Sequence, residues 1–239
     1  MKIKLCRLAA QLSIITMQSP TPDIMRLMAG RPLVPNPPGA PRGLYVIQEW
    51  ITLAEEQSIV DFLCANKWSD HMSSKRPTQH FGYRYTLNGY AASQEKLPTD
   101  WGVLRKHADR LEADFPGIKI AQCLANAYYK DTGIGAHQDR EQPIVFGVSV
   151  AGDINMRWTN IQNPAQKYEA LIPARSLYIM CEDAAYGWDH GIPVLATVRY
   201  PDPANGNQLM KVLKKPDWYV RASITYRHFD KPIGNDRLV

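Results

Sequence analysis

The chain of 239 residues contains 45% hydrophobic and 21% charged residues, which are ordinary values for a globular domain. This composition excludes collagen, a coiled coil and a disordered chain, and the length suffices for one sizeable hydrophobic core. Lysine and arginine (28) outnumber aspartate and glutamate (23), so the net charge of +5 permits a polyanionic partner without requiring one.

The cysteines and the N-terminal residues bear on the cellular compartment. Cys6, Cys64, Cys123 and Cys181 lie far apart and form no C-x-x-C pair, which favours a reducing compartment, cytoplasm or nucleus, over a disulfide framework. No apolar run approaches the roughly 20 residues that span a bilayer, so no membrane association is expected. Basic but no acidic residues precede Asp23, so a mitochondrial targeting segment is an alternative.

A proline-rich stretch divides the chain. Residues 31–43 contain five prolines and two glycines, which are too many backbone breakers for a helix or a central strand. We therefore assign residues 1–43 to an N-terminal arm and connector, residues 44–232 to a single domain, and residues 233–239 to a C-terminal tail.

Two amphipathic helices are predicted at the start of this domain. Thr52 and Glu55 form a capping box in front of an apolar helical face, which indicates a helix over residues 53–66. Apolar residues recur at helical spacing over residues 101–115 and stop at a Pro-Gly pair, which indicates a second helix.

After Gly117 the pattern changes to short apolar runs that are typical of strands. The runs cover residues 120–129, 144–150, 154–158, 176–181 and 221–226. Two helices followed by many short strands, without alternation of strand and helix, predict an α+β fold with an antiparallel sandwich or barrel.

The tripeptide H-x-D occurs three times in different settings, beginning at His107, His137 and His228. On a helix, residues two apart point about 200° apart, so the copy at His107 is expected to be a solvated helix surface. The copy at His137 follows two glycines and precedes an apolar strand. In an extended segment, residues two apart project to the same side, so His137 and Asp139 can converge on one ion.

An iron site with two imidazoles and one carboxylate needs a third ligand from elsewhere in the chain. His190 is the best candidate because it follows an apolar strand and stands beside a turn glycine. His228 is its rival, since it has an H-x-D context of its own. For His190 taken alone, the alternative is a hydrogen-bonded histidine without a metal.

The last predicted strand alternates polar and apolar residues, so Arg221, Ser223 and Arg227 share one face. If this face points into a barrel, two buried guanidinium groups need anionic partners, and a dicarboxylate supplies two carboxylates. Asn126 and Tyr128 share a strand face in the same way. The alternatives are a salt-bridged outer sheet face and a zinc hydrolase, which uses similar ligands.

Taken together, these motifs resemble the AlkB-like dioxygenases, which depend on Fe(II) and 2-oxoglutarate. The matching elements, in family order, are Asn126-x-Tyr128, His137-x-Asp139, the strand PIVFGVSV, the run that ends at His190, and Arg221-x-Ser223-x-x-x-Arg227. The resemblance implies a double-stranded β-helix (jelly roll) with flanking N-terminal helices. The chain departs from the common pattern at Ser223, where asparagine is usual, and in the long segment between His190 and Arg221.

The resemblance also implies roles for individual residues. His137, Asp139 and His190 would hold Fe(II) as the catalytic metal. The residues that would bind 2-oxoglutarate are Asn126, Tyr128, Arg221, Ser223 and Arg227, with Arg221 at the distal carboxylate and Arg227 near the end that chelates the metal. The implied reaction consumes O2, decarboxylates 2-oxoglutarate to succinate and hydroxylates a carbon near the iron; an N-methyl base would then release formaldehyde.

A segment before these motifs interleaves basic and aromatic residues, which suits phosphate contact and base stacking. Its candidate substrate residues are Lys75, Arg76, Phe81, Tyr83, Arg84 and Tyr85. The segment resembles the nucleotide-recognition lid of the family. The alternative is an amphipathic strand that packs its aromatic side chains into the domain.

The first functional hypothesis is therefore oxidative demethylation of N-alkylated nucleobases, as in DNA or RNA alkylation repair, by a monomer that binds single-stranded nucleic acid or a flipped base. The HFGY stretch, the long segment and Ser223 look most like the branch that hydroxylates modified wobble uridines in tRNA. That hypothesis is weakened because no RNA-binding or methyltransferase domain accompanies them. A third hypothesis, a protein-directed oxygenase or a non-catalytic interaction module, is weakened by the intact triad and both arginines.

Overall fold

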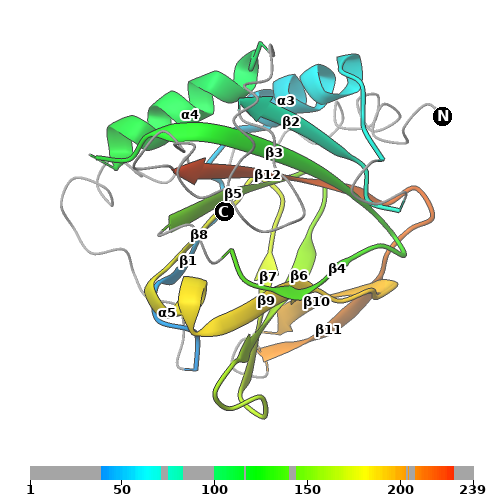
Figure 1. The fold of residues 1–239 in the computed structure, drawn as a ribbon. Coiled ribbons are helices and arrows are strands. Elements are labelled where there is room, and N and C mark those ends of the chain that lie inside the picture. Colours follow the sequence, from blue (N-terminus) through cyan, green and yellow to red (C-terminus); the bar gives the residue numbers. More distant parts are fainter. Residues whose placement is uncertain are drawn as a thin grey trace.

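A computed structural model describes residues 39–70, 75–82, 100–115, 117–139, 144–202, 204 and 208–228. Two antiparallel sheets face each other across the centre of the domain, and two helices cover the outer face of the larger sheet (Figure 1). This arrangement confirms the predicted α+β class and the jelly roll with flanking helices. The assignment of residues 1–43 and 233–239 to an arm and a tail stays a prediction.

The larger sheet has six strands. In spatial order they are β1 (Leu44–Ile47), β8 (Leu177–Cys181), β5 (Ile144–Val150), β12 (Val220–His228), β3 (Ile120–Tyr129) and β2 (Thr78–Gly82). The alternation along β12 is clear: Ala222, Ile224 and Tyr226 join the core beneath the helices, whereas Ser223 and Arg227 face the space between the sheets. The polar face of β12 therefore points inward.

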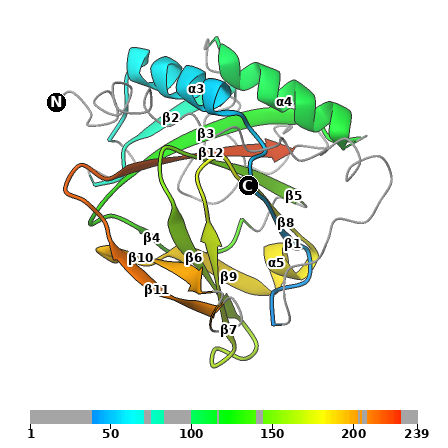
Figure 2. The ribbon, with the colours of Figure 1, turned by 180° about the vertical axis from the view of Figure 1, so that it is seen from behind.

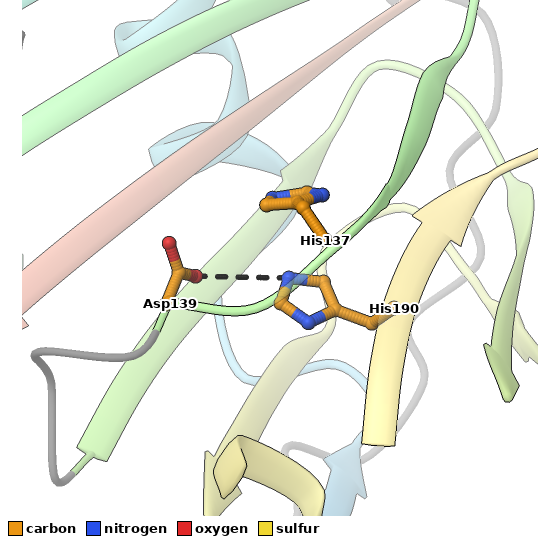
Figure 3. A group of neighbouring side chains, drawn as sticks. All are labelled: His137, Asp139 and His190. Atoms are coloured by element: carbon orange, nitrogen blue, oxygen red, sulfur yellow. Dashed lines mark ion pairs between the residues drawn. The ribbon is translucent and has the colours of Figure 1, made fainter. Parts of the chain in front are cut away.

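The smaller sheets complete the barrel, as the view from behind shows (Figure 2). The four-stranded sheet has the order β4 (Ile134–His137), β9 (Trp188–Ile192), β6 (Ile154–Asn160) and β7 (Lys167–Ile172), and the two-stranded sheet pairs β10 (Thr197–Asp202) with β11 (Gln208–Lys214). The register of β4 and β9 sets His137 opposite His190 (Figure 3). The long segment after His190 thus supplies the end of β9 and the β10–β11 pair.

The two long helices have the predicted positions. Helix α3 (Leu53–Ala65) begins at the capping box of Thr52 and Glu55, and helix α4 (Val103–Asp114) ends two residues before the Pro-Gly pair. Their buried faces pack on the larger sheet and form its outer core. A short helix that was not predicted, α5 (Glu182–Tyr186), connects β8 to β9. In the described part of the chain, no helix is long and apolar enough to cross a membrane.

The setting of His107 corrects one prediction. We expected a solvated helix surface, but His107 is only 3% exposed and its ring packs against Trp50, with 5.7 Å between the ring centroids. Burial lowers the pKa of His107, which favours a neutral ring. Asp109 lies on the outer face and pairs with Arg105. His107 is buried because it lies three residues after Leu104 and four before Leu111, on the same face of α4.

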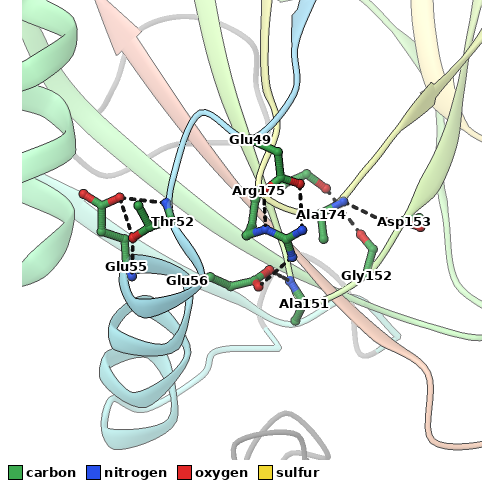
Figure 4. A network of polar contacts seen from close by, with 10 residues as sticks. Glu49, Thr52, Glu55, Glu56, Ala151, Gly152, Asp153, Ala174 and Arg175 are labelled. Atoms are coloured by element: carbon green, nitrogen blue, oxygen red, sulfur yellow. Dashed lines mark hydrogen bonds and ion pairs between the residues drawn. The ribbon is translucent and has the colours of Figure 1, made fainter. Parts of the chain in front are cut away.

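A partly buried ion-pair network ties the start of α3 to the turns between strands (Figure 4). Arg175 lies 2.7 Å from Glu49 and 3.4 Å from the fully buried Glu56, whose other carboxylate oxygen accepts the N–H of Ala151. Burial raises the pKa of Glu56, although Arg175 opposes this effect. The backbone is left-handed at Glu49 (φ 52°), Ala151 (φ 68°) and Arg175 (φ 63°). The network therefore stabilises three turns that side-chain-bearing residues rarely adopt.

Arg175→Ala should lower the free energy of unfolding by about 3 kcal/mol, because Glu56 would stay buried without its cation. Chemical denaturation of both proteins measures this difference. Arg42→Ala is the control, since it breaks an exposed pair with Asp183 and should hardly change stability. A loss for Arg175→Ala no larger than that of the control would contradict the prediction.

Candidate active site

Three potential metal ligands come together between the sheets. His137 ends β4, Asp139 follows it by two residues, and His190 lies in the middle of β9. Their ligand atoms lie within 4.8 Å of one another, and Oδ2 of Asp139 is 3.6 Å from Nε2 of His190 (Figure 3). Two imidazoles and one carboxylate so placed can bind one face of a metal ion and leave its other positions open.

Hydrogen bonding orients the first histidine of this cluster. The Nδ1 atom of His137 lies 2.9 Å from the carbonyl oxygen of Gly135. Because a carbonyl only accepts, this nitrogen must carry the proton, and Nε2 keeps a lone pair for a metal. The rival His228 lies elsewhere: its Nδ1 atom is 2.7 Å from the backbone nitrogen of Lys119, and it does not belong to the cluster.

The charges around the cluster suit a metal site. Burial alone would raise the pKa of Asp139, but Arg227 and the two histidines outweigh it, so this pKa is lowered and the carboxylate stays ionised. Arg227 donates from Nη2 to Oδ1 of Asp139 (3.2 Å) and from Nη1 to Gln122 (3.2 Å). Burial lowers the pKa of His190 to about 4, which keeps its ring neutral at physiological pH.

A cavity of about 400 Å³ adjoins the three ligands. One part of its wall is polar and comprises Asn126, Tyr128, Ser223 and Arg227. Apolar side chains from both sheets, including Val145, Met156 and Ile192, form other parts. Asn126 pairs with Ser223, and Tyr128 with Arg221, across the β3–β12 ladder. The strand pairing thus places the predicted 2-oxoglutarate residues side by side.

Arg221 lies beside this polar wall, fully buried, with its guanidinium 5.3 Å from the centre of the Tyr128 ring. Its Nε atom donates to Oγ of Ser149 (2.9 Å). Within the described residues, neither Nη1 nor Nη2 has a hydrogen-bond partner. A buried cation with two unfilled donors fits a carboxylate ligand, so the residues present suit 2-oxoglutarate.

Tyr178 on β8 belongs to the cavity, and sequence reasoning missed it. Its hydroxyl lies 3.1 Å from Oγ of Ser223. Its ring lies over Gly147 on β5, where an added Cβ would come within 1.9 Å of the ring. A glycine inside the apolar run PIVFGVSV is the signal that could have indicated this close approach.

Gly147→Ala should lower the free energy of unfolding by about 1–3 kcal/mol, because the methyl group overlaps the Tyr178 ring. It should also weaken binding of 2-oxoglutarate by moving Tyr178 away from Ser223. Thermal unfolding and cosubstrate titration measure the two effects. Gly135→Ala is the stability control, since an added Cβ there meets no atom within 4 Å. Equal stability of the two variants would contradict the prediction.

The candidate substrate residues have different settings in the structure. The Arg76 side chain lines the cavity and donates to Oδ1 of Asn126, so it faces inward. Phe81 requires a correction: it is 2% exposed and packs against Phe62, which makes it a core residue and not a stacking platform. Lys75 is exposed beside the cavity-lining Arg76. Tyr83, Arg84 and Tyr85 lie outside the described residues.

Comparison with known families agrees with this geometry. The model of the 2OG-Fe(II) oxygenase superfamily matches residues 43–227. The chain therefore belongs to this superfamily and is a dioxygenase that uses Fe(II) and 2-oxoglutarate. In sequence and in fold the chain is also similar to proteins that are named as AlkB homologues.

Three curated relatives illustrate the range of similarity. An uncharacterized protein, L905 of Acanthamoeba polyphaga mimivirus, is 27% identical over 82% of this chain and 90% of its own length. An Arabidopsis thaliana protein named alkylated DNA repair protein ALKBH8 homolog is 24% identical over 63% of this chain. A Macaca fascicularis protein named tRNA (carboxymethyluridine(34)-5-O)-methyltransferase ALKBH8 is 27% identical over 66% of it. The matches span 51% of the Arabidopsis protein and 25% of the macaque protein.

Two solved structures share the fold. OsALKBH1 superposes with a TM-score of 0.60 at 12% identity and covers 80% of this chain and 98% of its own. A 2OG-Fe(II) oxygenase family oxidoreductase from Burkholderia pseudomallei gives a TM-score of 0.54 at 13% identity, covering 82% of this chain and 89% of its own. These likenesses support the jelly-roll assignment.

Proposed function

We propose that the protein oxidatively demethylates N-alkylated nucleobases in nucleic acid, with His137, Asp139 and His190 as the ligands of Fe(II). The observation that carries the proposal is the convergence of these three side chains beside a cavity with a polar wall. Bound iron supplies the activation of dioxygen that turns 2-oxoglutarate into succinate and hydroxylates the substrate.

The remaining polar residues then position the cosubstrate. Arg227 keeps Asp139 ionised and oriented, and it would lie near the end of 2-oxoglutarate that chelates the metal. Arg221 offers Nη1 and Nη2 to the distal carboxylate. The cosubstrate-binding set would be completed by Asn126, Tyr128 and Ser223 in the cavity wall.

Three observations support a nucleic acid as the substrate. The chain carries a net charge of +5, which favours approach to a polyanion. Arg76 is a cation in the wall of the cavity and is not one of the predicted metal or cosubstrate residues. Relatives that match more than 60% of this chain carry names that refer to alkylated DNA repair or to tRNA.

Hydroxylation of a modified wobble uridine in tRNA is the second candidate. It is favoured by the names of the macaque, Mus musculus and Xenopus tropicalis relatives, which refer to carboxymethyluridine at position 34. The match spans only 24–26% of each of these proteins, so the methyltransferase activity in their names is not proposed for this chain. The two candidates share the chemistry of the site and differ in the base.

Succinate formation should rise when an N-methylated oligonucleotide is added to the Fe(II)-loaded protein and 2-oxoglutarate. Formaldehyde should be released in an amount equal to the additional succinate. The matched unmethylated oligonucleotide is the control and should give only background. Mass spectrometry of nucleosides from total tRNA tests the second candidate, which predicts a uridine derivative that gains one oxygen. Activity toward neither nucleic acid would contradict both candidates.

A further inference from the structure

Lys215 is a buried lysine that follows β11 in the long segment between His190 and Arg221. It is 2% exposed, and within the described residues its Nζ atom has no hydrogen-bond partner. The ammonium group lies 4.7 Å from the centre of the Tyr219 ring, and the backbone N–H of Lys215 donates to the carbonyl of Ala196 (2.8 Å). A buried ammonium group normally has an anionic partner.

A second buried cation lies close by. Burial and then the charge of Arg221 lower the pKa of Lys215 to about 8, while Asp131 has the opposite effect. The Tyr219 ring, 4.7 Å from the Lys215 ammonium group, and the Cβ atom of Arg221 both lie beside Gly152, so the two cations are neighbours. Arg221 also has two donor nitrogens without a partner among the described residues. Burying two neighbouring cations without an anionic partner costs free energy, whereas an anion bound between them would offset this cost.

We propose that Lys215 is a further cosubstrate-binding residue, which holds the distal carboxylate of 2-oxoglutarate together with Arg221. The inference rests on the role proposed for Arg221 in the preceding section. It adds a residue from outside the motif on β12 and explains why a lysine is buried at this end of the barrel.

The order of residues along β12 supports this placement. Arg221 and Arg227 lie near opposite ends of its inner face, with the cavity residues Ser223 and Thr225 between them. Arg227 contacts Asp139 of the metal cluster, so Arg221 and Lys215 mark the end of the site that lies away from the metal. A ligand with a 2-oxo acid at one end and a carboxylate at the other matches this distribution of charge.

Binding of two ligands to Mn(II)-loaded protein tests the proposal without turnover. The first is 2-oxoglutarate, and the second is 2-oxopentanoate, which lacks the distal carboxylate. Lys215→Met should lower the affinity for 2-oxoglutarate roughly 10- to 100-fold, as expected for loss of a charged hydrogen bond. The affinity for 2-oxopentanoate should stay unchanged. Lys215→Arg should retain most of the affinity. Lys214→Met, at the exposed neighbouring position, is the matched control and should change neither ligand.

The outcomes separate the inference from the function on which it rests. An unchanged affinity for 2-oxoglutarate in folded Lys215→Met, or an equal loss for both ligands, would overturn the role of Lys215. If Arg221→Ala weakens the binding of 2-oxoglutarate and Lys215→Met does not, only the role of Lys215 is overturned. If Arg221→Ala is also without effect, the proposed cosubstrate site fails as well.

A measurement on the parent protein keeps the proposal testable if Lys215→Met does not fold. The groups that act on Lys215 are Arg221, Asp131 and the Tyr219 ring. Of these, the pKa of Tyr219 is raised by burial, so it stays neutral. Binding of 2-oxoglutarate at pH 8 should take up protons, because a carboxylate beside Lys215 raises its pKa. Calorimetry in buffers of different ionisation enthalpy detects this uptake, and equal values for both ligands would overturn the proposal.

Discussion

Alanine at His137, Asp139 or His190 should remove bound iron and abolish succinate formation. We expect metal affinity to fall more than about 100-fold for each variant, since loss of a group that only orients a ligand already costs 10- to 100-fold. The physical reason is that the three ligand atoms approach within 4.8 Å of one another, so they can share one face of a bound ion. Iron content by elemental analysis and succinate by mass spectrometry are the two measurements.

His228→Gln provides the matched control for this series. His228 also begins an H-x-D tripeptide, but it lies outside the metal cluster and contacts the backbone of Lys119. We expect this variant to keep its iron. Iron loss in His228→Gln together with retention in His190→Ala would reverse the assignment of the third ligand.

Arg221→Ala should raise the concentration of 2-oxoglutarate needed for half-maximal turnover by the equivalent of about 2 to 5 kcal/mol. A carboxylate that loses a buried guanidinium partner forfeits this amount when the site excludes water. Turnover titrated with 2-oxoglutarate at fixed iron gives the measurement, and iron content should stay at the level of the parent.

Arg157→Ala is the control for Arg221→Ala, because Arg157 pairs with Glu169 and is not part of the cavity wall. It removes the same charge and should leave the 2-oxoglutarate requirement unchanged. A folded Arg221→Ala variant with the requirement of the parent would remove Arg221 from the cosubstrate site.

Much of the fold could be predicted from the sequence because the pattern of apolar and polar residues along a strand reflects which of its faces are buried. The strands over residues 120–129 and 144–150 have the predicted bounds, and the last predicted strand is longer by one residue at its start and two at its end. The spacing of His137 and Asp139 likewise placed both side chains on one side of an extended segment. The strand pattern made His190 the better candidate for the third ligand, but only the family resemblance separated it from His228, because the register of β4 and β9 follows from tertiary pairing.

Other features depend on neighbours that periodicity does not identify. Tyr178 joins the cavity because β8 lies beside β5, and Phe81 enters the core because β2 pairs with β3. The strands β1, β4 and β9 are four or five residues long, which is too short for their residue pattern to distinguish them from the surrounding loops. Lys215 would be expected at the surface from its residue type, and its burial follows from the chain that surrounds it.

The central position of β12 has a consequence for synthesis on the ribosome. β12 is the last strand among the described residues, and it separates β5 from β3 in the six-stranded sheet. A nascent chain that lacks β12 therefore has two sheet fragments with open inner edges, although helices α3 and α4 can already form locally. Because Arg221 and Arg227, the proposed partners of 2-oxoglutarate, arrive with this strand, we expect cosubstrate binding only after nearly all of the described domain has left the exit tunnel.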